Sequence, residues 1–304
     1  MDGALFIHKS AGVTSFDVIR RLQKMLPYRN EVKLGHGGTL DPFATGLLIV
    51  LVGRGVKLAQ YFLHSKKAYE GRIQFGLTTI PGDPTAPVSE RSDVFPTSLE
   101  EIQSKATEFT QDSYWQTPPM HSAKKLNGKP LYELARQGIE VEREPKLCQI
   151  HHYEILSYSS PFSDFRVQCS SGTYIRTLTQ DLAKKLGTVG LLETLHRTGS
   201  GRFHINHSQS LEDIQAEVEK GRRWNELDCW VPFDQLLDSY PRIDITSEEY
   251  QALCHGKQEI LKQILGRAPE VSDLEKYWVF YHSNALAAIA RKDRGTWGLE
   301  RVFI

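Results

Sequence analysis

A carboxylate stands in the most irregular stretch of the chain, GHGGTLDPFATG at residues 35–46. Glycine permits backbone conformations and close approaches that side chains forbid, and Pro42 disfavours a helical conformation of the preceding Asp41. The segment therefore predicts a shaped loop, and the apolar run LLIVLV at 47–52 predicts a buried strand after it. A carboxylate held in such a loop can shape a turn, bind a metal ion or act as a catalyst.

The motifs of several other enzyme classes are absent. The pair Gly128-Lys129 lacks the hydroxyl residue and the earlier glycine of a phosphate-binding loop. GRGVKL at 53–58 has two of the three glycines of a dinucleotide loop, and no GxSxG elbow offers an acyl-transfer serine. We therefore expect no cofactor, and the candidate chemistry rests on carboxylate, tyrosine and arginine side chains.

Metal binding finds little support in the sequence. None of the eleven histidines lies in an HExxH motif, and the best pair, His204 and His207, has no third ligand. The four cysteines are scattered and form no CxxC pair. We expect neither a metal site nor a disulfide framework, and free thiols fit a reducing compartment.

The segments that must position Asp41 have recognisable patterns. Residues 4–9 predict a strand, and Thr14 or Ser15 is the expected N-cap of the helix that follows. Alternation at 68–76 predicts a further strand. Three more strand-like runs are expected at 148–158, 165–171 and 172–178, the last turning into a helix at 179–187.

The remaining segments indicate long loops, acidic helices and a separate tail. The four prolines of 78–96 and the basic segment 116–130 predict loops. Helices are expected at 98–109, 131–138, 208–222 and 246–254, and strands at 276–293 and 297–304. The alternation of single strands and helices favours an α+β fold, with a boundary near Tyr240–Pro241.

Composition is that of a soluble globular protein. The chain has 304 residues, of which 40% are hydrophobic and 24% are charged, and this permits one large domain or two smaller ones. No run approaches the roughly twenty apolar residues that span a bilayer. The start MDGALFIHKS lacks the features of an export signal, so we expect a cytoplasmic protein.

The net charge is zero, but its distribution is uneven. Lys and Arg outnumber Asp and Glu by 10 to 5 in residues 1–70 and by 12 to 8 in residues 116–203. If these two blocks share a face, the fold presents a basic surface for nucleic acid despite overall neutrality. The same blocks are also compatible with an ordinary solvated surface.

Several segments resemble the motifs of one enzyme family. GHGGTLDPFATGLLIVLVGRGVKLAQ resembles the family's signature, and KKAYEGRIQFG resembles its second motif. SSGTYIRTLTQDLAKKLG, followed by LLETLHRTGSGRF, resembles the third. MHSAKKLNGKPLYELARQGIEVEREP is similar to a stretch typical of bacterial members. The family that these motifs resemble is TruB, the pseudouridine synthases that act on the TΨC loop of transfer RNA.

The resemblance implies a fold and an activity. The fold is a mixed, largely antiparallel sheet with flanking helices in a catalytic domain at 1–240, with inserted RNA-contacting loops near 116–145. A small β-rich, RNA-contacting module is implied at 241–304. The implied reaction is cofactor-free isomerisation of uridine 55 in tRNA after base flipping. The implied protein is a monomer that needs neither a protein partner nor a guide RNA.

The resemblance also assigns roles to single residues. Asp41 is implied to be the nucleophile, Tyr69 to stack on the base and assist deprotonation, and Arg176 to pair with the aspartate. Four residues are implied to bind the substrate: Lys9, His36, Tyr174 and Leu195. Ile80, Pro81 and Gly82 stand where the family has a further Thr and Asp pattern, which leaves the assignment of Asp83 open.

The chemistry is also reasonable from the residue types. Isomerisation breaks the bond from N1 to the ribose and rejoins the ring through C5, and a carboxylate can form and release the ester-like adduct that this requires. An arginine partner keeps the carboxylate ionised, and an aromatic face suits a flipped base. Lys124, Lys125 and Lys129 adjoin these motifs, and we expect them to contact phosphate.

Plainer interpretations stay open for single residues and for the whole chain. Taken alone, Asp41 is a turn former, Tyr69 and Tyr174 are half-buried strand aromatics, and Leu195 is core. Two other functions also fit the motifs: a pseudouridine synthase for another RNA, and a chaperone that refolds tRNA.

Overall fold

The computed structural model describes residues 1–26, 32–122, 125–126, 128–268 and 276–303. Internal contacts divide the chain into two compact units. The larger unit comprises Leu5–Trp230, and the smaller comprises Met1–Ala4 with Val231–Ile304. Among the helices of the described segments, none is long and apolar enough to cross a membrane.

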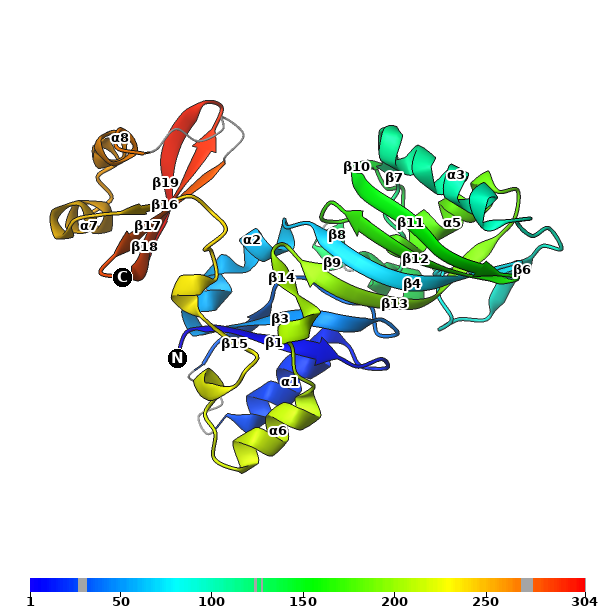
Figure 1. Ribbon diagram of the computed structural model, residues 1–304, viewed down its shortest axis with the longest axis horizontal. Coiled ribbons are helices and arrows are strands. Elements are labelled where there is room, and N and C mark those ends of the chain that lie inside the picture. Colours follow the sequence, from blue (N-terminus) through cyan, green and yellow to red (C-terminus); the bar gives the residue numbers. More distant parts are fainter. Residues whose placement is uncertain (27–31, 123–124, 127, 269–275, 304) are drawn as a thin grey trace. The chain divides into compact units, whose positions relative to one another are not determined.

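A mixed sheet with helices beside it forms the larger unit (Figure 1). Its strands follow the order β11-β12-β4-β13-β3-β1. Their bounds are Ile150–Ser159 (β11), Phe162–Cys169 (β12), Lys67–Phe75 (β4), Gly190–Ser200 (β13), Thr45–Val52 (β3) and Gly3–Lys9 (β1). Neighbours from β11 to β13 are antiparallel, whereas β13 and β3 run parallel. The expected α+β fold with a mixed, largely antiparallel sheet is confirmed.

Two short strands extend this sheet. One precedes the glycine-rich loop, and the other follows β13 in the sequence. β2 (Leu34–His36) pairs antiparallel with β3, and β14 (Phe203–His204) pairs antiparallel with β13. β3 is buried along nearly its whole length because its sequence, TGLLIVLV, is apolar on both faces. The loop that carries Asp41 therefore joins β2 and β3, two strands that pair with each other.

Four longer helices support the sheet of the larger unit. They are α1 (Ser15–Met25), α3 (Leu99–Gln111), α5 (Ile175–Lys185) and α6 (Leu211–Glu219). Thr14 is the N-cap of α1 and forms a capping box with Asp17, and Ser98 caps α3. α1 and α6 lie side by side in Figure 1, and α3 packs on β11. The helices expected after Thr14 and near 98–109 and 208–222 are confirmed.

One predicted strand is wrong. The run 172–178 was expected to be extended, but α5 already begins at Ile175. Its Ile, Thr and Tyr residues favour strands in isolation. In the fold, Ile175, Leu178 and Leu182 lie at helical spacing and are buried, so tertiary packing outweighs propensity. Arg176 consequently lies in the first turn of a helix.

The two predicted loops contain short strands. β5 (Leu77–Thr79) pairs with β6 (Val88–Arg91) inside the proline-rich segment, and β8 (Lys125–Leu126) pairs with β9 (Lys129–Pro130) in the basic one. Ladders of two to four residues give too little alternation to be read from sequence. The other short elements of the larger unit include α2 (Ala59–Leu63), α4 (Leu131–Arg136), β7 (Tyr114–Gln116) and β10 (Lys146–Cys148), which pairs with β7.

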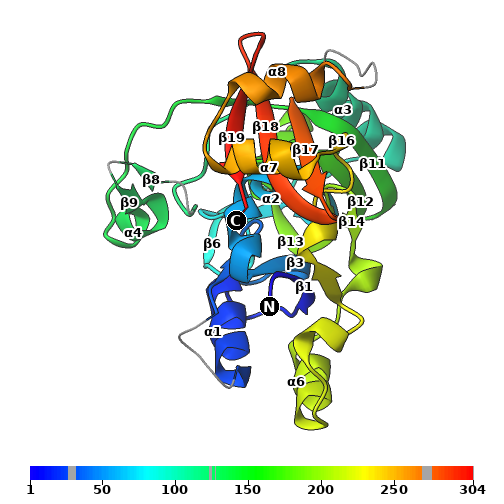
Figure 2. The same cartoon turned by 90° about the vertical axis from the view of Figure 1, so that its left-hand side faces the viewer.

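The smaller unit is a sheet covered by two helices. Its strands follow the order β16 (Arg242–Asp244), β17 (Tyr277–His282), β18 (Ala285–Asp293) and β19 (Thr296–Val302). Figures 1 and 2 show α7 (Ser247–Cys254) and α8 (Glu259–Leu265) on one face of this sheet. Their side chains Leu253, Leu261 and Ile264 share a core with Trp278 and Phe280.

This unit begins earlier than the boundary expected at Tyr240–Pro241. Asp234 belongs to it, because its backbone carbonyl accepts a hydrogen bond from the Tyr281 hydroxyl. The Asp234 carboxylate also accepts one from the Leu286 amide at 2.7 Å. The segment after Trp230 therefore folds with the C-terminal strands.

Candidate active site

The loop between β2 and β3 is held in place by α1 and β1. The Ser15 hydroxyl accepts a hydrogen bond from the Leu40 amide at 2.9 Å and donates to the Leu40 carbonyl at 3.3 Å. The Lys9 ammonium donates to the Pro42 carbonyl at 3.3 Å, and the Gly12 amide donates to the same oxygen at 2.8 Å. The residues on both sides of Asp41 are thus fixed to neighbouring elements.

Arg176 reaches Asp41 from the first turn of α5. Its Nε lies 2.9 Å from Asp41 Oδ2, and its Nη2 lies 3.2 Å from Oδ1. This is the two-point pairing that a planar guanidinium makes with a carboxylate. The side chain of Arg176 is 4% exposed and that of Asp41 is 34% exposed. The carboxylate can therefore be reached from outside while its partner cannot.

The rest of the Arg176 guanidinium is also occupied. Nη1 donates to the Pro81 carbonyl at 2.9 Å, and Nη2 donates to the His121 carbonyl at 2.8 Å. Nη1 also lies 3.5 Å from Asp83 Oδ2. Because every side of the fork has an acceptor, Arg176 has one defined position.

Asp83, whose assignment the sequence left open, belongs to this site. It closes the turn from Thr79, whose hydroxyl accepts from the Asp83 amide at 3.1 Å and donates to the Asp83 carbonyl at 2.6 Å. Gly82 has a φ of +77°, which other residues rarely adopt. The turn presents the Pro81 carbonyl and the Asp83 carboxylate to Arg176 together.

Electrostatics around Asp41 act in both directions. Burial raises its pKa above the ordinary value, and the Asp83 carboxylate adds to that rise, whereas Arg176 and Lys9 oppose it. The charge of Asp41 in turn influences Lys9, Tyr69 and Tyr174. The structure therefore brings these sequence-predicted residues around one carboxylate.

Tyr69 lies on β4, between β12 and β13. It is 8% exposed, and its cross-strand neighbours are Val167 and Arg197. Burial raises the pKa of Tyr69 to about 12, against the influence of the Arg197 guanidinium. Tyr69 is thus a neutral phenol at neutral pH. Leu195 lies two residues before Arg197 on β13 and is buried at 6% exposure.

Tyr174 is the N-cap residue of α5 and is fixed by Gln116. The Gln116 side chain accepts from the Tyr174 amide at 2.7 Å and donates to the Tyr174 carbonyl at 2.9 Å. Gln116 also donates to the Tyr114 hydroxyl at 2.9 Å, which donates to Asp181 on α5 at 2.6 Å. This chain of hydrogen bonds sets the position of the helix end that carries Arg176.

The other predicted substrate-binding residues are largely enclosed. The side chain of Lys9 is fully buried, and its ammonium donates to the carbonyls of Ser10, Val13 and Pro42. Burial lowers the pKa of Lys9 to about 8, although Asp41 opposes the shift. His36 ends β2, and burial together with Arg197 lowers its pKa.

The remaining candidates from the sequence are the lysines expected to contact phosphate and the histidine pair considered for a metal ion. Lys129 on β9 is exposed, whereas Lys124 and the side chain of Lys125 lie outside the described residues. Within the described segments, no group of three or more His, Cys, Asp or Glu side chains is arranged to hold a metal ion. His204 and His207 are among the described residues, and they are not part of any potential metal-binding group there.

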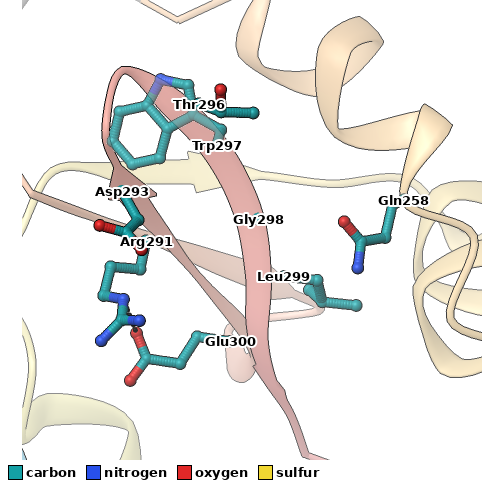
Figure 3. A pocket seen from close by; sticks show the side chains of 8 residues that line it. All are labelled: Gln258, Arg291, Asp293, Thr296, Trp297, Gly298, Leu299 and Glu300. Atoms are coloured by element: carbon teal, nitrogen blue, oxygen red, sulfur yellow. Dashed lines mark ion pairs between the residues drawn. The ribbon is translucent and has the colours of Figure 1, made fainter.

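A separate cavity of ≈ 270 Å³ lies in the smaller unit (Figure 3). Arg291, Trp297, Leu299 and Glu300 line it from β18 and β19, and Gln258 faces them from the start of α8. Arg291 Nε and Glu300 Oε2 lie 3.6 Å apart and form an ion pair. This cavity lacks the combination of carboxylate, tyrosine and buried arginine that surrounds Asp41.

Comparison with known proteins gives a consistent result. A family model described as TruB family pseudouridylate synthase (N terminal domain) matches residues 23–175, half of the chain. A second, described as tRNA pseudouridylate synthase B C-terminal domain, matches residues 176–238. The chain belongs to the TruB family. Pseudouridine synthases are isomerases, and the family resemblance seen in the sequence motifs is confirmed.

Relatives of this TruB-family chain carry one common name. A protein of Dehalococcoides mccartyi named tRNA pseudouridine synthase B is 35% identical over all of this chain and 97% of its own length. Proteins of the same name from Clostridium kluyveri and Opitutus terrae are 40% and 41% identical. They cover 84% and 72% of this chain, and 84% and 91% of their own lengths.

Solved structures support the fold of the TruB-family chain. A chain in the crystal structure of a Cbf5-Nop10-Gar1 complex superposes with a TM-score of 0.75 at 23% identity, covering 99% of this chain and 85% of that one. A chain in the structure of an H/ACA RNP bound to a substrate RNA containing 2'-deoxyuridine gives 0.70 at 21%, with the same coverage. At such identity the likeness concerns the fold alone.

Sequence reasoning missed two of the residues that organise this site. In the sequence, Gln116 is only the first residue of the basic segment 116–130, and Arg197 is only one residue of the motif LLETLHRTGSGRF. Arg197 gives no clear signal, because arginines at strand positions are usually exposed. Gln116 gives none either, since its role depends on Tyr174, which is 58 residues away.

Proposed function

We propose that the protein isomerises uridine to pseudouridine at position 55 in the TΨC loop of tRNA, with Asp41 as the nucleophile. The relatives named tRNA pseudouridine synthase B support the substrate class. The observation that carries the proposal is the Asp41 carboxylate, one third exposed and held at two points by a buried arginine.

The geometry suits the chemistry of this isomerisation. The bond from N1 to the ribose must break, the ring must turn, and C5 must bond to the ribose and lose its proton. An ionised carboxylate forms an ester-like adduct with the reactive carbon and releases it afterwards. Arg176 holds both oxygens of Asp41, so that the free lone pairs point in a fixed direction.

Tyr69 and Leu195 fit the binding of a base that has left its stack. An aromatic ring on β4 offers a face for stacking, and an aliphatic side chain on β13 offers an apolar wall. Tyr69 serves in this proposal as a stacking surface. It can accept the C5 proton only as the phenolate, and its raised pKa makes that form scarce at neutral pH. In this proposal His36 and Tyr174 also contact the flipped base.

The partner in this proposal is tRNA alone. Lys129 and the basic blocks of the sequence contact phosphates of the T-stem and loop, which positions the target without reading bases. Lys9 holds the Asp41–Pro42 backbone in place. We place the protein in the cytoplasm as a monomer, without an obligatory protein or guide-RNA partner.

The proposal is tested by mapping pseudouridine in an unmodified tRNA transcript incubated with purified protein and no added cofactor. A single new pseudouridine at position 55 is the expected result. Modification at another position of the transcript overturns the proposed target. Tight tRNA binding without any modification overturns the proposed reaction and favours a tRNA chaperone.

A further inference from the structure

Arg197 is a buried arginine that hydrogen-bonds to the loop of Asp41. It lies on β13 and is 2% exposed. Its Nε donates to the Leu47 carbonyl at 2.7 Å. Its Nη2 and Nη1 donate to the carbonyls of Gly38 and Thr39 at 3.1 and 3.3 Å. All three acceptors are backbone atoms of the segment that contains Asp41.

These acceptors lie at the two ends of the loop. Gly38 and Thr39 precede Asp41, and Leu47 follows it at the start of the buried part of β3. One planar guanidinium therefore spans the loop's entry and its exit. A flexible segment that is closed at both ends loses most of its freedom to move its central residue.

The backbone of Arg197 adds a second restraint on the same loop. Arg197 and Gly46 are paired where β13 and β3 run parallel. A Cβ at Gly46 would lie 2.4 Å from the Arg197 carbonyl oxygen, and Gly46 has a φ of +106°. Only glycine fits this approach, so the strand and the loop exit are in direct contact at this residue.

The charge of Arg197 is not explained by an ion pair. Among the residues that the structure describes, no carboxylate forms a salt bridge with it. Its guanidinium also interacts with the side chain of Tyr69, its cross-strand partner. A buried cation without a carboxylate is expensive for folding, and an apolar side chain of similar size usually stabilises a core better. Packing alone therefore does not account for an arginine here.

We propose that Arg197 is a positioning residue for the reaction. Its guanidinium joins Gly38 and Thr39 to Leu47 through hydrogen bonds. These bonds fix the position of the loop backbone, and therefore the position of the Asp41 carboxylate relative to Arg176 and the base. This inference rests on the proposed function of Asp41. Two arginines then divide the task, since Arg176 orients the carboxylate and Arg197 orients the backbone that bears it.

The first test needs no RNA. We measure amide hydrogen exchange in the wild type, Arg197→Met and Arg197→Lys. Both variants are expected to exchange the Leu40 and Ala44 amides at least tenfold faster, because these amides lie inside the closed loop. The Phe165 amide on β12 serves as the internal control and should keep its rate. Unchanged exchange at Leu40 and Ala44 in both variants overturns the inference.

The second test measures tRNA affinity and the single-turnover rate separately. A displacement of a catalytic group by about 1 Å slows a reaction roughly 100-fold, so we expect that loss in Arg197→Met with a Kd within threefold of wild type. Arg197→Lys keeps the charge but cannot bridge both ends, and we expect a similar loss. Arg72→Met, which removes an exposed arginine of the same sheet, should leave both quantities unchanged.

The outcomes separate this inference from the proposed function. A wild-type rate in Arg197→Lys shows that charge rather than bridging matters and overturns the inference, as does a loss that appears only in Kd. If Arg197→Met does not fold, Arg197→Lys decides by itself. A wild type that modifies no tRNA overturns the proposed function, and the exchange experiment still decides whether Arg197 closes the loop.

Discussion

Arg176 and Asp41 form a two-point ion pair in which only the carboxylate is accessible. The Nε–Oδ2 and Nη2–Oδ1 distances are 2.9 and 3.2 Å. The same guanidinium is anchored by the carbonyls of Pro81 and His121, which come from two loops far apart in the sequence. The carboxylate is thus oriented by a side chain that has no freedom of its own.

Arg176→Lys should therefore slow the reaction strongly. A lysine keeps the charge but offers a single point of contact and cannot reach both oxygens of Asp41. Loss of one charge-assisted hydrogen bond, about 2 kcal/mol, corresponds to roughly a 30-fold lower single-turnover rate. Arg72→Lys is the matched control, because Arg72 makes the same two-point pair with Asp164 on the surface. Equal rates in the two variants would remove Arg176 from the proposed mechanism.

The pH dependence of the rate should report on Asp41. Its pKa is raised by burial and by Asp83, and Arg176 opposes that rise. Because the reaction needs the ionised carboxylate, its rate is maximal above this pKa and falls as the pH is lowered through it. The acid limb should therefore lie above the pH at which an exposed aspartate titrates.

Asp83→Asn should move that acid limb to lower pH. The substitution removes the neighbouring negative charge, which lowers the pKa of Asp41. The measurement is the single-turnover rate across the acid range, with Asp164→Asn as a remote control. A limb that stays in place or moves to higher pH would contradict this electrostatic assignment.

Gln116→Ala should affect both stability and rate. Removing its amide leaves the Tyr174 backbone groups unpaired, which lowers the free energy of unfolding by about 2 kcal/mol. The α5 end then shifts, so the rate should also fall at least tenfold. Gln103 provides the comparison, because it bridges the Tyr153 carbonyl and the Ile155 amide in the same way. Gln103→Ala should destabilise the protein equally without slowing the reaction.

Lys129→Ala should weaken tRNA binding through charge alone. One lost phosphate contact reduces the slope of log K against log salt by about 0.7–0.9. Binding measured between low and physiological salt gives this slope directly. Lys220→Ala is the control, since Lys220 is exposed but already paired with Glu217. If the slope matches wild type in both variants, Lys129 contacts no phosphate and is an ordinary solvated surface residue.

The sequence predicted those parts of the site that lie in contiguous motifs. Asp41, Tyr69 and Arg176 each stand in a recognisable segment, and the fold brings them to one place. The strand predicted at 172–178 failed because Ile175 and Leu178 face the core from the first turns of α5 there, although the run as a whole favours a strand. Local propensity does not show which part of the fold an amphipathic segment packs against, and that packing decides its secondary structure.

The supporting residues could not be predicted in the same way. Arg197 acts on Gly38 and Leu47, more than 100 residues away, and this depends on the parallel pairing of β13 with β3. The role of Asp83 depends on the positive φ of Gly82, which turns the chain back towards Arg176. Such relations arise from tertiary geometry and leave no periodic pattern in the sequence.

The most direct test of the central claim is pseudouridine mapping in an unmodified tRNA transcript with Asp41→Asn and wild-type protein side by side. Asparagine keeps the size of the side chain and can still accept hydrogen bonds from Arg176, but it cannot form the adduct. We expect one new pseudouridine at position 55 with wild type, none with Asp41→Asn, and tRNA affinities within a few fold. Conversion of position 55 by Asp41→Asn at a rate near that of wild type would contradict this claim.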